Sequence, residues 1–273
     1  MNSITLRRLH VTAASCLTAL CIAVPIGHAQ QSTPSAKQLS TVIDMLRSSD
    51  PVVRVGVLCM RQIFDSNATA LIPTLIELLN DAEPVSPEVC REDHRRWWGE
   101  EQPVTPGQEA ARALVHIGIA SFDPLVKALE NTGATARRNA AWALGALDDQ
   151  RAVAPLFASL RDTDPAVREQ ASWALGALDD SRAVQPLIGA LRDASSAVRR
   201  QAAWALGAID DATAVDALVA ALKDSDARVR EQSAWALGAI GDGRASPGLT
   251  LALKDGESRV RKQAAWALGA IAD

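Results

Sequence analysis

The sequence predicts an all-α fold: a right-handed α-solenoid of about seven stacked helical hairpins. Two observations carry this prediction. Tryptophan returns every 31 residues inside the block Trp-Ala-Leu-Gly-Ala, and each period contains two amphipathic helical patterns. A fixed period of this length is typical of a solenoid, in which each unit buries its apolar face against its neighbours. The five tryptophans are Trp142, Trp173, Trp204, Trp235 and Trp266.

The unit at 151–180 shows how each hairpin is built. Apolar residues recur at i, i+3, i+4 and i+7 in its first half, and at i, i+4, i+8 and i+11 in its second half, so each half predicts a helix with one apolar face. Asp164 followed by Pro165 predicts a helix start, and Asp179-Asp180 supplies the cap of the next unit. The expected buried face consists of Val153, Leu156, Phe157, Leu160, Val167, Ala171, Leu175 and Leu178.

These features resemble the HEAT family, in particular the short 31-residue HEAT-like repeats named after phycobilisome bilin lyases. The matching features are a proline in the first helix, as at Pro155, an aspartate in the turn, and a Val-Arg pair that opens the second helix. Tetratricopeptide repeats have a longer period of 34 residues. The resemblance implies a ladder of turn aspartates and arginines between neighbouring units. Its members here are Asp162, Arg168, Asp193, Arg199, Asp224, Arg230, Asp255 and Arg261.

The resemblance is strongest from residue 133 onward and weakens toward the N-terminus. Together with the features of the N-terminal half, this change divides the chain into four segments. We expect a secretory signal peptide at 1–29, degenerate N-terminal HEAT-like repeats at 30–81, a proline-rich insertion loop at 82–106 and the HEAT-like repeat array at 107–273.

The first segment predicts export. Arg7 and Arg8 precede an apolar, acid-free run, and small residues at Gly27 and Ala29 suit a cleavage site before Gln30. The run is too short for a convincing membrane span, and its flanks match lipoprotein and twin-arginine signals poorly. We therefore expect a periplasmic or secreted bacterial protein, without a membrane span once the signal is removed.

Composition and motifs exclude several function classes. The formal net charge is −4, with 28 basic and 32 acidic residues. The chain therefore lacks the excess of positive charge that is typical of proteins that bind nucleic acid. No phosphate-binding loop, nucleophile elbow or zinc-ligand spacing occurs. Deoxyhypusine hydroxylase, an iron enzyme of the HEAT family, depends on His-Glu pairs, whereas neither His94 nor His116 precedes a glutamate here. We predict no catalytic residues, no metal site and no cofactor.

Two features of the N-terminal half leave alternatives open. Cys59 and Cys90 are the only cysteines after the signal segment and are a disulfide candidate in an oxidising compartment, although Cys59 could be a core residue and Cys90 a free thiol. The insertion holds Trp97 and Trp98, which either dock a partner or pack onto the solenoid.

Helical angles place the repeated tryptophans opposite the apolar stripe of the second helix. At about 100° per residue, Trp173 lies on the far side from Val167 and shares its face with Gln170. We therefore expect solvent-facing tryptophans along a concave groove, with a parallel amide row of Asn139, Gln170, Gln201, Gln232 and Gln263. Charges four positions before the tryptophans alternate in sign at Arg138, Glu169, Arg200, Glu231 and Lys262. Alternatively, the tryptophans only pack against neighbouring helices, and the charges pair across units.

The functional hypothesis is an exported scaffold that binds protein or an extended peptide in this groove. An envelope glycan-binding protein, and an oxidoreductase or lyase implied by the family resemblance, are the alternatives. The last helix, 259–271, repeats the internal pattern without polar replacements, which predicts end-to-end self-association or a shortened version of a longer array.

Overall fold

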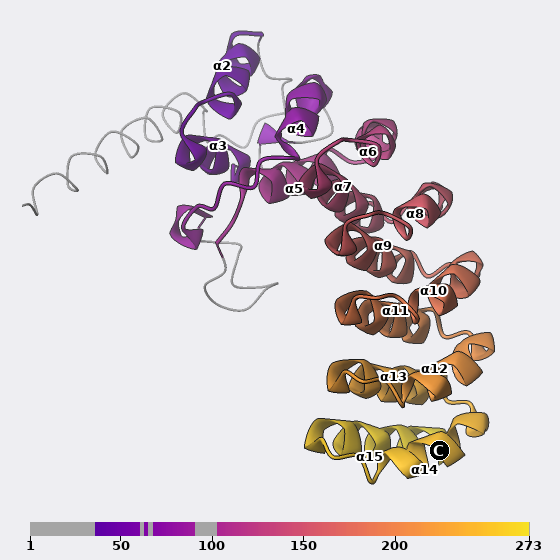
Figure 1. Ribbon diagram of the computed structural model, residues 1–273. Helices are drawn as coiled ribbons and strands as arrows, with labels where there is room; N and C mark the ends of the chain where they lie inside the picture. The colour runs from indigo at the N-terminus through magenta and orange to yellow at the C-terminus, as the bar shows by residue number, and fades with distance from the viewer. Residues whose placement is uncertain (1–35, 61–62, 65–67, 91–102, 273) are drawn as a thin grey trace, which may run out of the picture. The chain divides into compact units, whose positions relative to one another are not determined.

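The computed structural model describes residues 36–60, 63–64, 68–90 and 103–272 (Figure 1). These residues form α-helices joined by short turns and 3₁₀ segments; within the described ranges the β-type pairing is one isolated antiparallel bridge, Val85 with Val104. The helices pair into seven consecutive hairpins, so the predicted all-α solenoid is confirmed. The chain divides into two compact units, residues 1–121 and 122–273.

The first unit contains two hairpins. Its helices are α2 (Ala36–Leu46), α3 (Pro51–Leu58), α4 (Ile72–Leu78) and α5 (Pro106–Ile117). Two of these helices have side-chain N-caps: Asp50 accepts a hydrogen bond from Val52 N, and Thr105 with Gln108 forms a capping box. The segment between α4 and α5 is anchored at its base, because Val85 and Val104 are buried and pack against Val55 of α3.

The second unit contains five hairpins. Its helices are α6 (Phe122–Ala128), α7 (Ala134–Ala146), α8 (Val153–Ser159), α9 (Pro165–Ala177), α10 (Val184–Ala190), α11 (Ser196–Ile209), α12 (Val215–Ala221), α13 (Ala227–Ile240), α14 (Ser246–Ala252) and α15 (Ser258–Ala272). The longer second helices, α7, α9, α11, α13 and α15, stack as one layer, and the short first helices form the other (Figure 1).

Repeated aspartates begin and end these helices. Asp164 and Asp226 accept hydrogen bonds from the first turns of α9 and α13, and Asp180 caps the 3₁₀ turn before α10. Asp148 and Asp210 adopt positive φ at the ends of α7 and α11, a conformation that aspartate tolerates better than most residues. Local sequence therefore sets the hairpin boundaries.

The core lies between the first and second helices of each hairpin. Val153 and Leu156 of α8 and Val167 and Leu175 of α9 are completely buried, as the apolar stripes predict. Successive second helices pack directly on one another, whereas successive first helices make little contact. The second helices therefore form the more tightly packed layer of this unit, and the predicted binding surface belongs to this layer.

Candidate binding surface

The repeated tryptophans lie on the second helices and are partly covered. Trp142, Trp173, Trp204 and Trp235 are half-buried, and Trp266 of α15 is 49% exposed. The four inner rings are only partly open to solvent, because each of them also contacts a neighbouring hairpin.

Each contact lies at a glycine of the preceding second helix. A Cβ on Gly176 would lie 2.7 Å from Ala205 Cα and 2.9 Å from Trp204 Cζ3. The joints at Gly145, Gly207 and Gly238 have the same arrangement. Glycine thus lets two helix backbones approach closely, and the tryptophan edge covers the gap. Sequence reasoning missed this role, although the signal was present in the fixed Trp-to-Gly spacing of every repeat.

Two of the rings also stack on each other. Trp142 and Trp173 have centroids 6.4 Å apart and planes inclined by 12°. This offset stacking stabilises the joint between α7 and α9. Because the rings touch, the space between them does not accept a ligand side chain, and only their outer parts remain available for binding.

The amide row follows the tryptophans, with one exception. Gln170, Gln201, Gln232 and Gln263 are half-buried, and their side chains make no hydrogen bond within the described residues. Asn139 is 4% exposed, so its predicted place in an accessible row was wrong. The asparagine side chain is one methylene shorter than that of glutamine, so its amide stays closer to the backbone.

The alternating charges pair at one point of the row. Arg200 Nη2 lies 3.0 Å from Glu169 Oε1 across neighbouring hairpins. Arg138, Glu231 and Lys262 make no ion pair within the described part of the chain. The surface therefore presents charges of both signs.

An arginine–aspartate ladder joins the hairpins beside this surface. Arg168 Nε donates to Asp193 Oδ2 at 2.7 Å and Nη2 donates to Oδ1 at 2.8 Å, while Nη1 donates to the carbonyl of Asp162. Equivalent bidentate pairs join Arg137 to Asp162, Arg199 to Asp224 and Arg230 to Asp255. The ladder implied by the family resemblance is present at Arg168, Arg199 and Arg230, each bound to the turn of the following hairpin. The predicted member Arg261 donates only to carbonyls of its own turn within the described residues.

The ladder carboxylates are electrostatically stabilised. The hydrogen bonds from Arg168, together with one from the backbone N–H of Ser195, hold the pKa of Asp193 below its ordinary value, although partial burial opposes this shift. The pKa of Arg168 is raised by the same pair. Asp162, Asp224 and Asp255 also have lowered pKa values because of their arginine partners. These residues are therefore structural charges that fix the spacing of the hairpins.

Comparison with known families agrees with this architecture. The family model described as HEAT repeats matches residues 108–162, 122–203 and 186–269, together more than half of the chain. The chain belongs to the HEAT repeat family. No curated protein matches the chain in a sequence comparison.

Three of the solved structures that resemble this chain do so at low sequence identity, and two of these three have a TM-score above 0.5. A structure of Kap95p with RanGDP is 14% identical, covers 85% of this chain and 37% of that chain, and has a TM-score of 0.63. A designed armadillo repeat protein in complex with the peptide (KR)4 is 20% identical, covers 86% and 99%, and has a TM-score of 0.51. The complex of CpcE and CpcF of phycocyanin lyase from Nostoc is 21% identical, covers 91% and 99%, and has a TM-score of 0.46.

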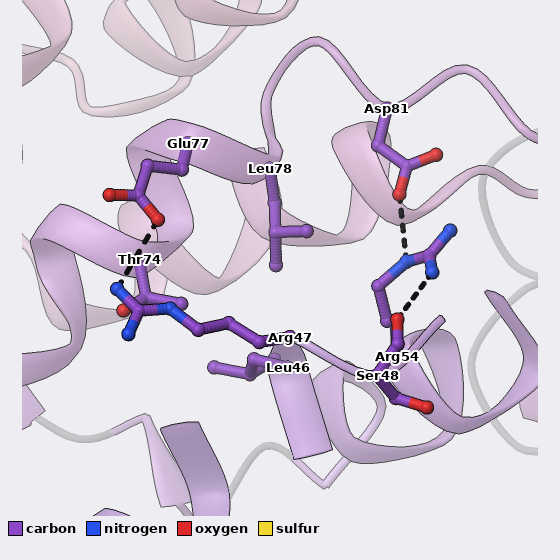
Figure 2. Close-up of a pocket in the computed structure, with 8 residues that line it drawn as sticks. All are labelled: Leu46, Arg47, Ser48, Arg54, Thr74, Glu77, Leu78 and Asp81. Carbon is purple, nitrogen blue, oxygen red and sulfur yellow. Dashed lines mark hydrogen bonds and ion pairs between the residues drawn. The ribbon is translucent and has the colours of Figure 1, made fainter. Parts of the chain in front are cut away.

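The degenerate HEAT repeats of the first unit keep one rung of the ladder. Arg54 Nε lies 2.8 Å from Asp81 Oδ2, and Arg54 Nη1 donates to the carbonyl of Ser48 (Figure 2). The rung borders an open depression of about 340 Å³, whose other wall carries the exposed Arg47–Glu77 pair. Because these charges pair with each other, the depression offers no obvious group for a ligand.

The remaining predicted residues of the first unit are only partly described. Cys59 is disulfide-bonded. Both Cys59 and Val89, the residue before Cys90, pack against the buried cluster of Val55, Val85 and Val104. The side chain of Cys90 lies outside the described residues, as do Trp97, Trp98 and the predicted signal peptide, so these assignments stay predictions.

The described residues also bear on metal binding and on membrane insertion. Within the described residues, no group of three or more His, Cys, Asp or Glu side chains is placed to hold a metal ion. None of the described helices has the length and apolar character required to span a bilayer.

Proposed function

We propose that this protein is an exported HEAT-repeat scaffold that binds an extended peptide, or a flexible segment of a protein, along its second helices. The amide row is the observation that carries the proposal. Gln170, Gln201, Gln232 and Gln263 recur once per hairpin, are partly accessible, and have no hydrogen-bonding partner within the described residues. Amides left in this state at a regular spacing are suited to pair with the backbone of a bound chain, because each offers both donors and an acceptor.

The side chains around the amides fit the same ligand class. The outer parts of the half-buried tryptophans offer apolar and cation-binding surface beside each glutamine. The ladder holds the hairpins at a constant register, so a ligand would meet preorganised groups, which lowers the entropic cost of binding. Kap95p binds RanGDP and the designed armadillo repeat protein binds the peptide (KR)4, so proteins of this fold bind protein and peptide.

Export is the second part of the proposal. Its support is the sequence of residues 1–29, with Arg7 and Arg8 before an apolar run and small residues at the cleavage site. A disulfide at Cys59 suits an oxidising compartment such as the bacterial periplasm. The partner would then be an envelope or secreted protein.

A peptide library tests the binding surface. A random peptide library displayed on phage is selected on the mature protein, and the affinity of an enriched peptide is measured by fluorescence polarisation. We expect the triple variant Gln170→Ala, Gln201→Ala, Gln232→Ala to bind this peptide at least tenfold more weakly, since each lost hydrogen bond contributes roughly 0.5–1.5 kcal/mol. Gln185→Ala, on the exposed side of α10, is the matched control and should bind as the wild type does.

The outcome of this selection distinguishes peptide binding from the alternative ligand. Equal binding by the triple variant and the wild type would exclude the amide row as the peptide site. A glycan ligand is the second candidate, favoured by the partly exposed tryptophan rings, on which sugars can stack. Binding to a glycan array, with no enriched peptide, would support it instead.

A further inference from the structure

The accessible surface of the second helices consists of two parallel lanes. Each hairpin has a charged residue four positions before its tryptophan, so the two side chains lie one helical turn apart on the same face. In α13 these residues are Glu231 and Trp235, both half-buried, with Gln232 beside Glu231. A chain that crosses the helices over the glutamines therefore has charged groups along one side and aromatic rings along the other. The charged lane consists of Arg138, Glu169, Arg200, Glu231 and Lys262.

The lanes repeat at a short interval. The ring centroids of Trp142 and Trp173 are 6.4 Å apart. The later joints bring the helix backbones equally close, because a Cβ on the joint glycine of α7, α9, α11 or α13 would lie 2.7 or 2.8 Å from the Cα of an alanine of the next helix. An extended chain rises by about 3.3 Å per residue, so one hairpin corresponds to about two residues. Successive side chains of such a chain point in opposite directions, so alternate residues face the same lane.

The charged lane is not uniform along the array. Glu169 and Arg200 bind each other across the joint between α9 and α11, with 3.0 Å between Oε1 and Nη2, so this stretch is neutral. Arg138 on α7 and Glu231 on α13, one on each side of this pair, make no ion pair with any described residue. Lys262 on α15 is exposed and is likewise not paired with Glu231 within the described ranges. The lane therefore offers a free cation and, three hairpins later, a free carboxylate.

We propose that the ligand of this surface is an extended peptide with an acidic side chain over Arg138 and a basic side chain over Glu231, about six residues apart. This assignment rests on the proposed peptide binding along the amide row, and adds the charge pattern and the register of the peptide. The interval follows from three joints, each spanned by about two residues. Both charged side chains then face the same lane, because residues an even number of positions apart point to the same side. The residues between them face the neutral pair or the tryptophans, where uncharged and apolar side chains fit.

The two free charges also determine the direction of the bound peptide. Both side chains are half-buried, so an ion pair formed there is less screened by water than a fully exposed pair. A peptide that bound in the opposite direction would place like charges opposite Arg138 and Glu231, which disfavours binding. A given peptide with this charge pattern therefore binds in one direction.

Parallel phage selections test the charge pattern. A random dodecapeptide library displayed on phage is selected on the mature wild-type protein and on Glu231→Lys, and the enriched clones are sequenced. On the wild type, we expect pairs of an acidic and a basic residue at a separation of about six to be enriched about fivefold or more over the unselected library. On Glu231→Lys, an acidic residue should replace the basic member of the pair.

Fluorescence polarisation with one enriched peptide measures the size of the effect. Replacing the basic residue of the peptide by glutamate should weaken binding to the wild type about tenfold or more, and Glu231→Lys should restore binding of this altered peptide. Glu231→Gln, a smaller change, should remove the preference for the basic residue without creating one for an acidic residue. Asp216→Lys on α12 is the matched control. It makes the same change in net charge at an 88% exposed side chain of the first-helix layer, and should leave peptide binding unchanged.

Three results would overturn the charge pattern and leave the amide row as a peptide site. They are enriched peptides without opposite charges near this separation, no restored binding of the altered peptide by Glu231→Lys, and equal effects of Glu231→Lys and Asp216→Lys. The amide-row triple variant separates the two proposals, because it should weaken binding of every enriched peptide, whereas Glu231→Gln should weaken only those with the basic residue. A selection that enriches no peptide would overturn both.

Discussion

At the scale of single residues, glycine and tryptophan share one structural task in this array. Gly207 allows the backbone of α13 to approach, and Trp235 covers the resulting joint with the edge of its ring. The same glycine on α15, Gly269, faces open space. Residues with identical local sequence therefore have different energetic roles, depending on what packs against them.

This difference predicts opposite effects of the same substitution. Gly207→Ala should lower the free energy of unfolding by about 1–3 kcal/mol, because the new Cβ overlaps backbone atoms of α13 that cannot move independently. Gly269→Ala should raise it by up to about 1 kcal/mol, because alanine favours helix and meets nothing. Urea unfolding followed by circular dichroism measures both. A lower free energy of unfolding for Gly269→Ala would contradict the open space around this residue.

The tryptophans should behave as partly buried packing residues. Trp204→Ala should lower the free energy of unfolding by about 1–2 kcal/mol, since roughly half of a large apolar side chain loses its contacts. Leu206→Ala, at a completely buried position, should cost roughly 2–5 kcal/mol because it leaves a cavity. The two variants are compared in the same urea titration. Equal losses would show that the tryptophan is a full core residue.

At the scale of elements, the aspartate–arginine ladder connects each hairpin to the next. Each turn aspartate accepts both its partner's guanidinium and a backbone N–H of its own turn, as Asp193 does from Arg168 and Ser195. The pair is largely shielded from solvent, with side-chain exposures of 16% for Arg168 and 12% for Asp193. We therefore expect the Arg168–Asp193 pair to contribute more to the free energy of unfolding than a surface ion pair does.

The ladder predicts a pH-dependent stability. Asp193→Asn should lower the free energy of unfolding at pH 7 by roughly 1.5–3 kcal/mol, because a charge-assisted bond is lost. The folded pKa of Asp193 lies below its unfolded value, so the stabilisation is full above about pH 4 and is lost as the pH falls through the folded pKa. Urea midpoints of wild type and variant should therefore converge in acid.

A solvent-exposed aspartate provides the control for this titration. Asp216 on α12 has an 88% exposed side chain, so Asp216→Asn should match the wild type at every pH. A wild-type advantage over Asp193→Asn that stayed constant down to pH 2 would show that hydrogen-bond geometry, and not charge, determines the effect.

The predicted pairing of Cys59 with Cys90 belongs to the same scale, because it would link two elements of the first unit. We expect non-reducing peptide mapping of the exported protein to find Cys59 joined to Cys90. Reduction should lower the free energy of unfolding of this unit by about 2–4 kcal/mol, as the cross-link restricts the unfolded chain. Two free thiols in the denatured, unreduced protein would exclude the pairing.

At the scale of the whole molecule, seven hairpins fall into two compact units divided between Ser121 and Phe122. The ladder follows the same division. In α5, Glu109 stands where the other second helices have arginine, and the turn before α7 has Asn131 where later turns have aspartate. These substitutions remove the means of forming an arginine–aspartate rung at this point of the sequence.

Export also concerns the whole molecule, and the mass of the mature chain tests it. Expression in a bacterium should yield, in the periplasmic fraction, a protein that begins near Gln30, because signal peptidase requires small residues before the cleavage site. Ala29→Leu should leave the precursor uncleaved and membrane-associated, whereas Ala82→Leu should be processed normally. An intact N-terminus on the wild-type protein in the cytoplasm would contradict the prediction.

The sequence by itself determined the repeat and the helix boundaries. These depend on the spacing of apolar residues and on caps such as Asp164-Pro165, whose interactions are local or recur at a fixed interval. Only the tertiary structure decided how far the tryptophan rings are exposed, that Asn139 is buried, and which glycines have a helix packed against them. Helical angles describe one helix in isolation, whereas burial depends on the hairpin packed against it, as the contrast between Gly238 and Gly269 shows.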